Sequence, residues 1–168
     1  EIGVRLVGSE MCIETGSDTI SLAALTEEVF CDLDPVAEKH QVRLIQTDGD
    51  CTVTGSYILL YRAVYNLVEN AIKYNRPSGS VTVSIHSAES AVLEVTDTGI
   101  GISPENQEKI FDPFYRVDKS RSRAMGGAGL GLALVSEIAR QHNGQVKVTQ
   151  SSEKGSTIAL ILPESTDY

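Results

Sequence analysis

The chain has 168 residues, 41% of them hydrophobic, and a formal net charge of -9 at pH 7. This length suffices for one domain with its own core, and no apolar run is long enough to span a bilayer. The negative charge argues against general nucleic-acid binding, which needs a basic surface. The three cysteines lack CxxC spacing and the three histidines are scattered, so neither a disulfide framework nor a Cys/His zinc site is expected.

Hydrophobic periodicity and turn residues predict the elements in chain order. Ser21 caps a first helix, which Pro35 should kink or end, and Ser56 opens a second long helix. Ser103 and Pro104 begin a short helix. The expected ranges are a helix at 21–40, a strand at 42–47, a helix at 56–75, strands at 80–87 and 91–97, a helix at 130–142, and a closing hairpin of 145–151 with 157–162.

This order predicts an α+β fold, a two-layer α/β sandwich in which three helices cover one face of a mixed, mostly antiparallel sheet of about five strands. We expect residues 1–20 to be a linker or an N-terminal strand, 21–165 to be the domain, and 166–168 to be a tail. Between Phe111 and Ala128 the sequence shows no periodicity. An irregular segment of that length is longer than a structural connection needs, which indicates a function.

The second helix carries the stretch NLVENAIKYN, in which Asn66, Asn70, Lys73 and Tyr74 share one face. Asparagine is a mediocre helix former, so two of them on one face suggest a role. An asparagine oxygen suits Mg²⁺ beside phosphates, and a lysine one turn on can neutralise phosphate charge. A solvent-facing polar stripe is the alternative.

A second stretch, DTGIGI, follows directly from the strand at 91–97. Asp97 continues the row of Leu93 and Val95, so a carboxylate ends an apolar face. Such a partly buried acid needs donors, and an exocyclic amine such as that of adenine provides them. Gly99 and Gly101 would let a flat ligand approach the backbone. A simple turn is the alternative.

A third stretch, GGAGLGLAL, runs into an apolar helix, whose N-terminal amides and dipole favour phosphate. It is neither a P-loop nor a Rossmann fingerprint, and a flexible hinge is the alternative. Just before it the segment RVDKSRSR gathers basic residues that could meet an anionic ligand or form a solvated loop. Phe111 and Phe114 precede this segment and could anchor it or cover a bound ring, although core packing is expected for at least one.

Taken in order, NLVENAIKYN, DTGIGI, FDPFYRV, GGAGLGLAL and EKGST resemble the catalytic and ATP-binding domain of sensor histidine kinases. That family belongs to the wider superfamily of gyrase, mismatch-repair and heat-shock-chaperone ATPases. The resemblance extends from about Ile20 to Pro163, and it implies ATP and Mg²⁺ as cofactors.

The resemblance also implies roles for individual residues. Asn70 would ligate Mg²⁺, Asp97 would bind the adenine amine, and Phe111 to Gly127 would form an ATP lid. Asn66, Lys73 and Arg116 would be catalytic, with Arg116 at the γ-phosphate. The nucleotide-binding set would be Asn66, Asn70, Lys73, Tyr74, Asp97, Gly99, Gly101, Ile102, Phe114, Arg116, Gly127, Gly129, Leu130, Gly131, Leu132 and Thr157.

Three positions depart from the family pattern. Ser56 stands where Asp is common and Asn143 where Gly is frequent, and both are tolerable replacements. Ala128 replaces a common Thr and leaves a hydroxyl contact in doubt.

The resemblance favours phosphoryl transfer over ATP hydrolysis. Related hydrolases carry a glutamate base where this chain has Asn66, and Glu69 should point away from Asn70. None of His40, His86 and His142 lies in the family's acceptor pattern, so the acceptor is expected on a separate dimerisation domain. A serine kinase of the anti-sigma type and a nucleotide-dependent interaction module without catalysis are the alternatives.

The implied partners are a phosphoacceptor and dimerisation domain of the same protein and a response regulator. The chain starts at Glu1 without a signal peptide, so we interpret it as a fragment. We expect it to be monomeric alone, and to be the cytoplasmic domain of a membrane-anchored protein that forms a homodimer.

Overall fold

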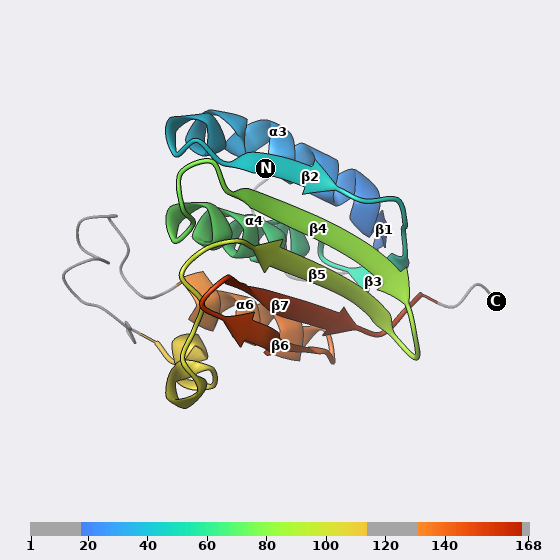
Figure 1. Cartoon of the computed structure of the whole chain (residues 1–168). Coiled ribbons are helices and arrows are strands. Elements are labelled where there is room, and N and C mark those ends of the chain that lie inside the picture. The colour runs from blue at the N-terminus through green and yellow to red at the C-terminus, as the bar shows by residue number, and fades with distance from the viewer. Residues whose placement is uncertain (1–17, 114–130, 166–168) are drawn as a thin grey trace, which may run out of the picture.

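The computed structural model describes residues 18–113 and 131–165. In Figure 1 the sheet lies in front, α4 and α6 lie behind it, and α3 runs along its upper edge. The elements are β1 (Asp18–Ser21), α3 (Leu22–Lys39), β2 (Arg43–Gln46), β3 (Thr52–Gly55), α4 (Tyr57–Lys73), β4 (Ser80–Ser87), β5 (Ala91–Asp97), the 3₁₀ turns η2 (Pro104–Asn106) and η3 (Lys109–Phe111), α6 (Gly131–Gln141), β6 (Gln145–Ser152) and β7 (Gly155–Leu162).

The main sheet has five strands in the order β2-β4-β5-β7-β6. Strand β2 runs parallel to β4, and the other neighbours are antiparallel. Because the three described α-helices pack against one face of this mixed sheet, the predicted α+β two-layer sandwich is confirmed.

Both long helices begin where their serine caps predict. The Ser21 hydroxyl accepts a hydrogen bond from the Ala24 amide, and the Ser56 hydroxyl accepts one from the Leu59 amide. Ser56 thus performs the capping role open to an aspartate. Pro35 lies inside α3, which continues to Lys39, close to the expected end of the helix at residue 40. No helix in the described ranges is long and apolar enough to cross a membrane.

The core lies between the sheet and α4. Alternate residues of β4 and β5, including Val83, Ile85 and Leu93, are buried on the helical side. They meet the apolar side of α4, where Leu67 and Val68 are almost fully buried. This contact fixes the rotation of α4, so its polar face turns away from the core.

A second, two-stranded sheet was only partly foreseen. Strand β1 pairs antiparallel with β3, with Asp18 opposite Gly55. The sequence allowed for an N-terminal strand, but the four residues of β3 were missed. The Ser165 amide donates to the Thr52 carbonyl at 2.8 Å, so the end of the described chain joins the same strand.

His142 connects α6 to the beginning of α4. Its Nε2 accepts a hydrogen bond from the Ser56 amide at 3.1 Å, and its Nδ1 lies 2.8 Å from the Ile138 carbonyl. The imidazole is therefore a neutral tautomer with the proton on Nδ1. Asn143 follows with a φ of 60°, a conformation that Asn and Gly tolerate, so Asn fits a position where the resemblance leads us to expect glycine.

Three tyrosine rings lie next to one another along α4. The ring centroids of Tyr57 and Tyr61 are 6.2 Å apart, and those of Tyr61 and Tyr65 are 6.1 Å apart. The Tyr57 hydroxyl donates to Glu28 of α3, and the Tyr61 hydroxyl donates to Asp32. Burial and the hydrogen bond to Glu28 raise the pKa of Tyr57 to about 12, and burial with the Asp32 contact raises that of Tyr61.

Replacing Tyr61 by phenylalanine should lower the free energy of unfolding by about 1 kcal/mol, because it removes the donor to Asp32 and keeps the ring. Chemical denaturation monitored by circular dichroism measures this difference. Tyr65→Phe is the matched control, since the Tyr65 hydroxyl has no hydrogen-bond partner among the residues that the structure describes. Equal effects of the two substitutions would show that the link to Asp32 contributes nothing.

Candidate functional site

The polar face of α4, the loop after β5 and the first turn of α6 meet at one end of the sandwich. Asn66, Asn70, Lys73 and Tyr74 are all half-buried there, in keeping with their shared helical face. A Cβ placed on Gly131, the first residue of α6, would lie 3.6 Å from the Asn66 side-chain oxygen. The structure therefore places the N-terminus of α6 beside Asn66.

Lys73 lies at the edge of this face. Its ammonium is 3.8 Å from a carboxylate oxygen of Glu69, and each side chain is about a quarter exposed. Glu69 extends toward Lys73, its neighbour one turn on, and this contact leaves untested the expectation that Glu69 points away from Asn70. Such a pair contributes about 0.3–0.5 kcal/mol, which a bound phosphate can outweigh.

The carboxylate of Asp97 lies at the end of β5 with both oxygens engaged. One oxygen accepts a hydrogen bond from the Gly99 amide at 2.9 Å, and the other accepts one from the Ser156 hydroxyl at 2.9 Å. Burial raises the pKa of Asp97 above its ordinary value, and these hydrogen bonds oppose the rise. The Ser156 backbone amide also donates to this carboxylate, which can accept about four hydrogen bonds, so it has room for a donor from a ligand.

Ser156 is the residue of this site that the sequence analysis missed. In the antiparallel pairing of β5 with β7, Asp97 faces Ser156 and Thr96 faces Thr157. The Thr157 hydroxyl lies 2.9 Å from that of Thr96, on the face of the sheet away from Asp97. The structure thus does not bring Thr157 to Asp97. The pairing of β5 with β7 joins strands that are far apart in the chain, so the sequence carried no local signal that could have identified Ser156.

Gly99 and Gly101 are close to protein backbone. A Cβ on Gly99 would lie 2.3 Å from the Tyr74 carbonyl oxygen, and one on Gly101 would lie 2.0 Å from the Ser152 carbonyl oxygen. Gly101 also has a φ of +77°. In this structure the glycines allow the loop to pack between the end of α4 and the β6–β7 hairpin.

The remaining described site residues lie around this loop. Tyr74 is the C-cap of α4, and its carbonyl accepts a hydrogen bond from the Ile100 amide. The Ile102 amide donates to the Ser151 hydroxyl at 2.7 Å, and Leu132 packs half-buried against the core. Phe111 ends η3 and also packs against the core, as expected for at least one of the two phenylalanines.

Several site predictions fall on residues 114–130, outside the described ranges. Most of the expected lid and the basic segment belong to them. The residues concerned are Phe114, Arg116, Gly127, Gly129 and Leu130.

A metal ion at this site would depend on few protein ligands. In the part of the chain that the structure describes, no three His, Cys, Asp or Glu side chains gather to hold a metal. The oxygen of Asn70 fits Mg²⁺, which often takes only one or two protein ligands and completes its shell with phosphate and water.

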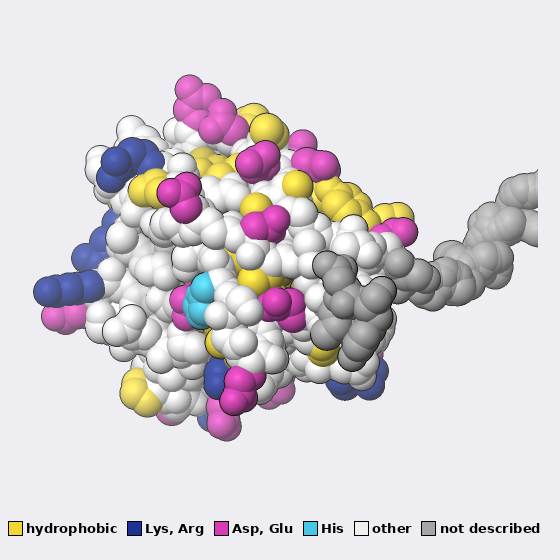
Figure 2. All heavy atoms as spheres, turned by 90° about the vertical axis from the view of Figure 1, so that its right-hand side faces the viewer, with side chains coloured by type: hydrophobic (Ala, Val, Ile, Leu, Met, Phe, Trp, Pro, Cys, Tyr) yellow, Lys and Arg dark blue, Asp and Glu magenta, His cyan; other side chains and the backbone are white. Residues whose placement is uncertain are grey.

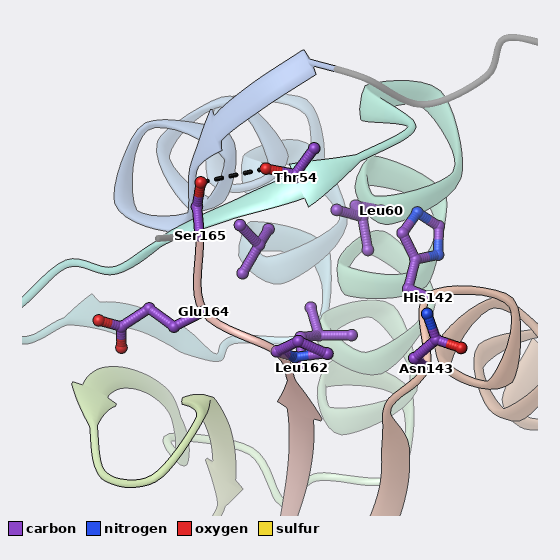
Figure 3. Close-up of a pocket in the computed structure, with 9 residues that line it drawn as sticks. Thr54, Leu60, His142, Asn143, Leu162, Glu164 and Ser165 are labelled. Atoms are coloured by element: carbon purple, nitrogen blue, oxygen red, sulfur yellow. Dashed lines mark hydrogen bonds between the residues drawn. The ribbon is translucent and has the colours of Figure 1, made fainter. Parts of the chain in front are cut away.

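A hollow of about 230 Å³ lies apart from these residues. Thr54 of β3, His142 and Asn143 at the end of α6, and residues 162–165 line it (Figure 3). Both ring nitrogens of His142 are already hydrogen-bonded, so this hollow offers no free imidazole. The face shown in Figure 2 has acidic side chains spread across it, which suits the net negative charge.

Comparison with protein families matches residues 55–166 to the family described as histidine kinase-, DNA gyrase B- and HSP90-like ATPases. The chain belongs to this family. The match includes α4, the loop after β5, α6 and the closing hairpin, which together hold the site residues described above.

Curated relatives are sensor histidine kinases. The chain is 38% identical over 166 residues to the sensor-like histidine kinase SenX3 of Mycolicibacterium smegmatis, covering 97% of this chain and 42% of that protein. It is 44% identical over 140 residues to the sensor histidine kinase RppB of Synechocystis, covering 83% of this chain and 30% of that protein. The chain therefore spans less than half the length of these relatives.

Solved structures share the fold. The mycobacterial sensor histidine kinase MprB matches 90% of this chain and 99% of its own, with a TM-score of 0.75 and 26% identity. Full-length ShkA in complex with AMPPNP matches 90% of this chain and 32% of its own, with a TM-score of 0.78 and 24% identity.

Proposed function

We propose that this chain is the catalytic and ATP-binding domain of a sensor histidine kinase. The observation that carries the proposal is that the half-buried carboxylate of Asp97 ends β5, while Asn66 on the polar face of α4 lies beside the N-terminus of α6. The first group suits an adenine and the second suits phosphates.

Asp97 would recognise the base. Gly99 and Ser156 hold its two oxygens, so the carboxylate is oriented before a ligand arrives. An exocyclic amine donates a hydrogen bond to a carboxylate, whereas a carbonyl at the same position would face it with like partial charge. This difference favours adenine over guanine.

Asn66, Asn70, Lys73 and the first turn of α6 would bind the phosphate side. Mg²⁺, when bound, would neutralise phosphate charge, and the Asn70 oxygen would hold it. The Lys73 ammonium would exchange Glu69 for phosphate, and the amides at the start of α6 would donate to phosphate oxygens.

The chemistry of α4 favours transfer over hydrolysis. A hydrolase needs a base that orients water, and this chain has the neutral Asn66 at the position discussed above. Glu69 is the nearby carboxylate on α4, and its partner is Lys73. The phosphoryl group would therefore go to a histidine on a dimerisation domain of the same protein, and from there to a response regulator.

The wider assembly follows from the same proposal. The full-length protein would be a membrane-anchored homodimer with this domain in the cytoplasm. One structural neighbour, the histidine kinase ThkA, was solved in complex with the response regulator TrrA.

The test is phosphoryl transfer from γ-labelled ATP to a supplied dimerisation hairpin from a related kinase. We expect label on the hairpin that is lost in acid and retained in alkali, as for phosphohistidine. Label with the opposite stability would identify a serine kinase, and free phosphate without protein label would identify a hydrolase.

Arg116→Ala should slow transfer more than it weakens ADP binding, since ADP lacks the γ-phosphate.

A further inference from the structure

Asn75 ties together three elements beside the proposed base site. It follows Tyr74 at the end of α4, and its side-chain amide donates to the Ser80 carbonyl at the start of β4, at 2.9 Å. Its side-chain oxygen accepts hydrogen bonds from the Arg76 amide at 2.8 Å and the Thr98 hydroxyl at 2.9 Å. Helix α4, β4 and the loop after β5 therefore share one side chain.

The orientation of this amide is fixed by its partners. The oxygen faces the Arg76 amide and the nitrogen faces the Ser80 carbonyl, so a flipped amide would lose both of these hydrogen bonds. The backbone of Gly79 packs closely against this amide. A Cβ on Gly79 would lie 2.2 Å from the Asn75 side-chain oxygen, so a larger residue at position 79 would displace it.

Thr98 connects the Asn75 side chain to the loop that carries Asp97. Its hydroxyl donates to Asn75 and accepts a hydrogen bond from the Ser80 amide at 2.9 Å. Thr98 lies between Asp97 and Gly99, and the Gly99 amide orients the Asp97 carboxylate. Ser156 holds the same carboxylate from β7. The Asp97 loop is thus held on one side by Ser156 and on the other by Asn75 through Thr98.

We propose that Asn75 is a positioning residue that sets base specificity, because it holds the Asp97 loop through Thr98. The inference rests on the proposed function, in which Asp97 reads the adenine amine. Loss of the Asn75–Thr98 link should let the carboxylate move, so the amine contact weakens while phosphate contacts persist.

The experiment compares binding of ATP and inosine triphosphate, which carries a carbonyl in place of the adenine amine. Calorimetry with Mg²⁺ should show that Asn75→Ala and Thr98→Val each weaken ATP binding by about five- to tenfold, with little change for inosine triphosphate. Combining the two substitutions should add little to either alone, because they break the same link.

Two controls separate positioning from general stability. Thr98→Ser keeps the hydroxyl and should retain the parent's preference for ATP. Gln46→Ala removes an amide that bonds to the Ala23 carbonyl, from the edge strand β2, and should leave the preference unchanged.

The outcomes distinguish failure of the positioning role of Asn75 from failure of the adenine assignment of Asp97. If the parent prefers ATP and Thr98→Val retains that preference, positioning by Asn75 is overturned while the proposed function stands. If the folded parent binds both nucleotides equally, the adenine assignment fails and this inference fails with it. If Asn75→Ala does not fold, Thr98→Val decides alone, because Thr98 is exposed and tolerates a similar side chain.

Discussion

Replacing Asn70 by alanine is expected to weaken Mg²⁺-dependent ATP binding on the order of 100-fold. The substitution removes the one oxygen on α4 that we assign to the metal, and even residues that only support metal ligands are worth about 10- to 100-fold in affinity. Titration calorimetry with ATP in Mg²⁺ and in a chelator measures the metal-dependent part. Only that part should fall.

The fold provides an internal check on this result. Asn70 is half-buried on α4, and alanine is the better helix former, so the variant should unfold at the same temperature as the parent or higher. Arg62→Ala, at an exposed position of the same helix, is the matched control and should bind ATP normally. Unchanged affinity of Asn70→Ala in Mg²⁺ would exclude Asn70 as a ligand.

The second large effect is expected for Asp97→Asn, which should weaken ATP binding by about 10- to 100-fold and remove the preference for ATP over GTP. Gly99 and Ser156 each donate to one carboxylate oxygen. An amide is uncharged and has only one oxygen, so it offers fewer acceptor sites to Gly99, Ser156 and the adenine amine together, and a buried donor left unpaired costs about 1–3 kcal/mol. Competition binding with both nucleotides measures the change. If the variant binds ATP and GTP as the parent does, Asp97 does not read the base.

The pH dependence of binding gives an independent readout for Asp97. Burial raises its pKa above the ordinary value of 3.8, so the carboxylate takes up a proton at a higher pH than an ordinary Asp. Protonated Asp97 accepts poorly from the amine, so ATP affinity should fall with decreasing pH in that range. In Asp97→Asn this component should be absent, while titration of the nucleotide itself remains.

This loss of binding should not reflect unfolding driven by Asp97. A carboxyl whose pKa is higher in the folded state than in the unfolded chain binds its proton more tightly when folded. Its contribution to the free energy of unfolding therefore becomes more favourable as the pH falls through the folded pKa. Circular dichroism at each pH distinguishes loss of ATP binding by the folded protein from loss of binding through unfolding.

The sequence by itself determined the strongly periodic parts of this protein. The apolar stripe of α4 fixed which side packs on the sheet, and so it fixed that Asn66 and Asn70 lie together on the other side. The alternation of β5 placed Asp97 at the end of a buried row. The serine caps located the starts of α3 and α4 within one residue, because capping is a local interaction.

Only the tertiary structure decided the contacts that depend on register and on distant partners. Strand β3 has four residues, too few for a periodic signal, and it forms because β1 and Ser165 pair with it. Ser156 rather than Thr157 meets Asp97, because a shift of one residue in a strand moves a side chain to the other face of the sheet. Asn75 gains its role only when β4 and the loop after β5 come together, since its partners Ser80 and Thr98 lie on separate elements that folding brings to the end of α4.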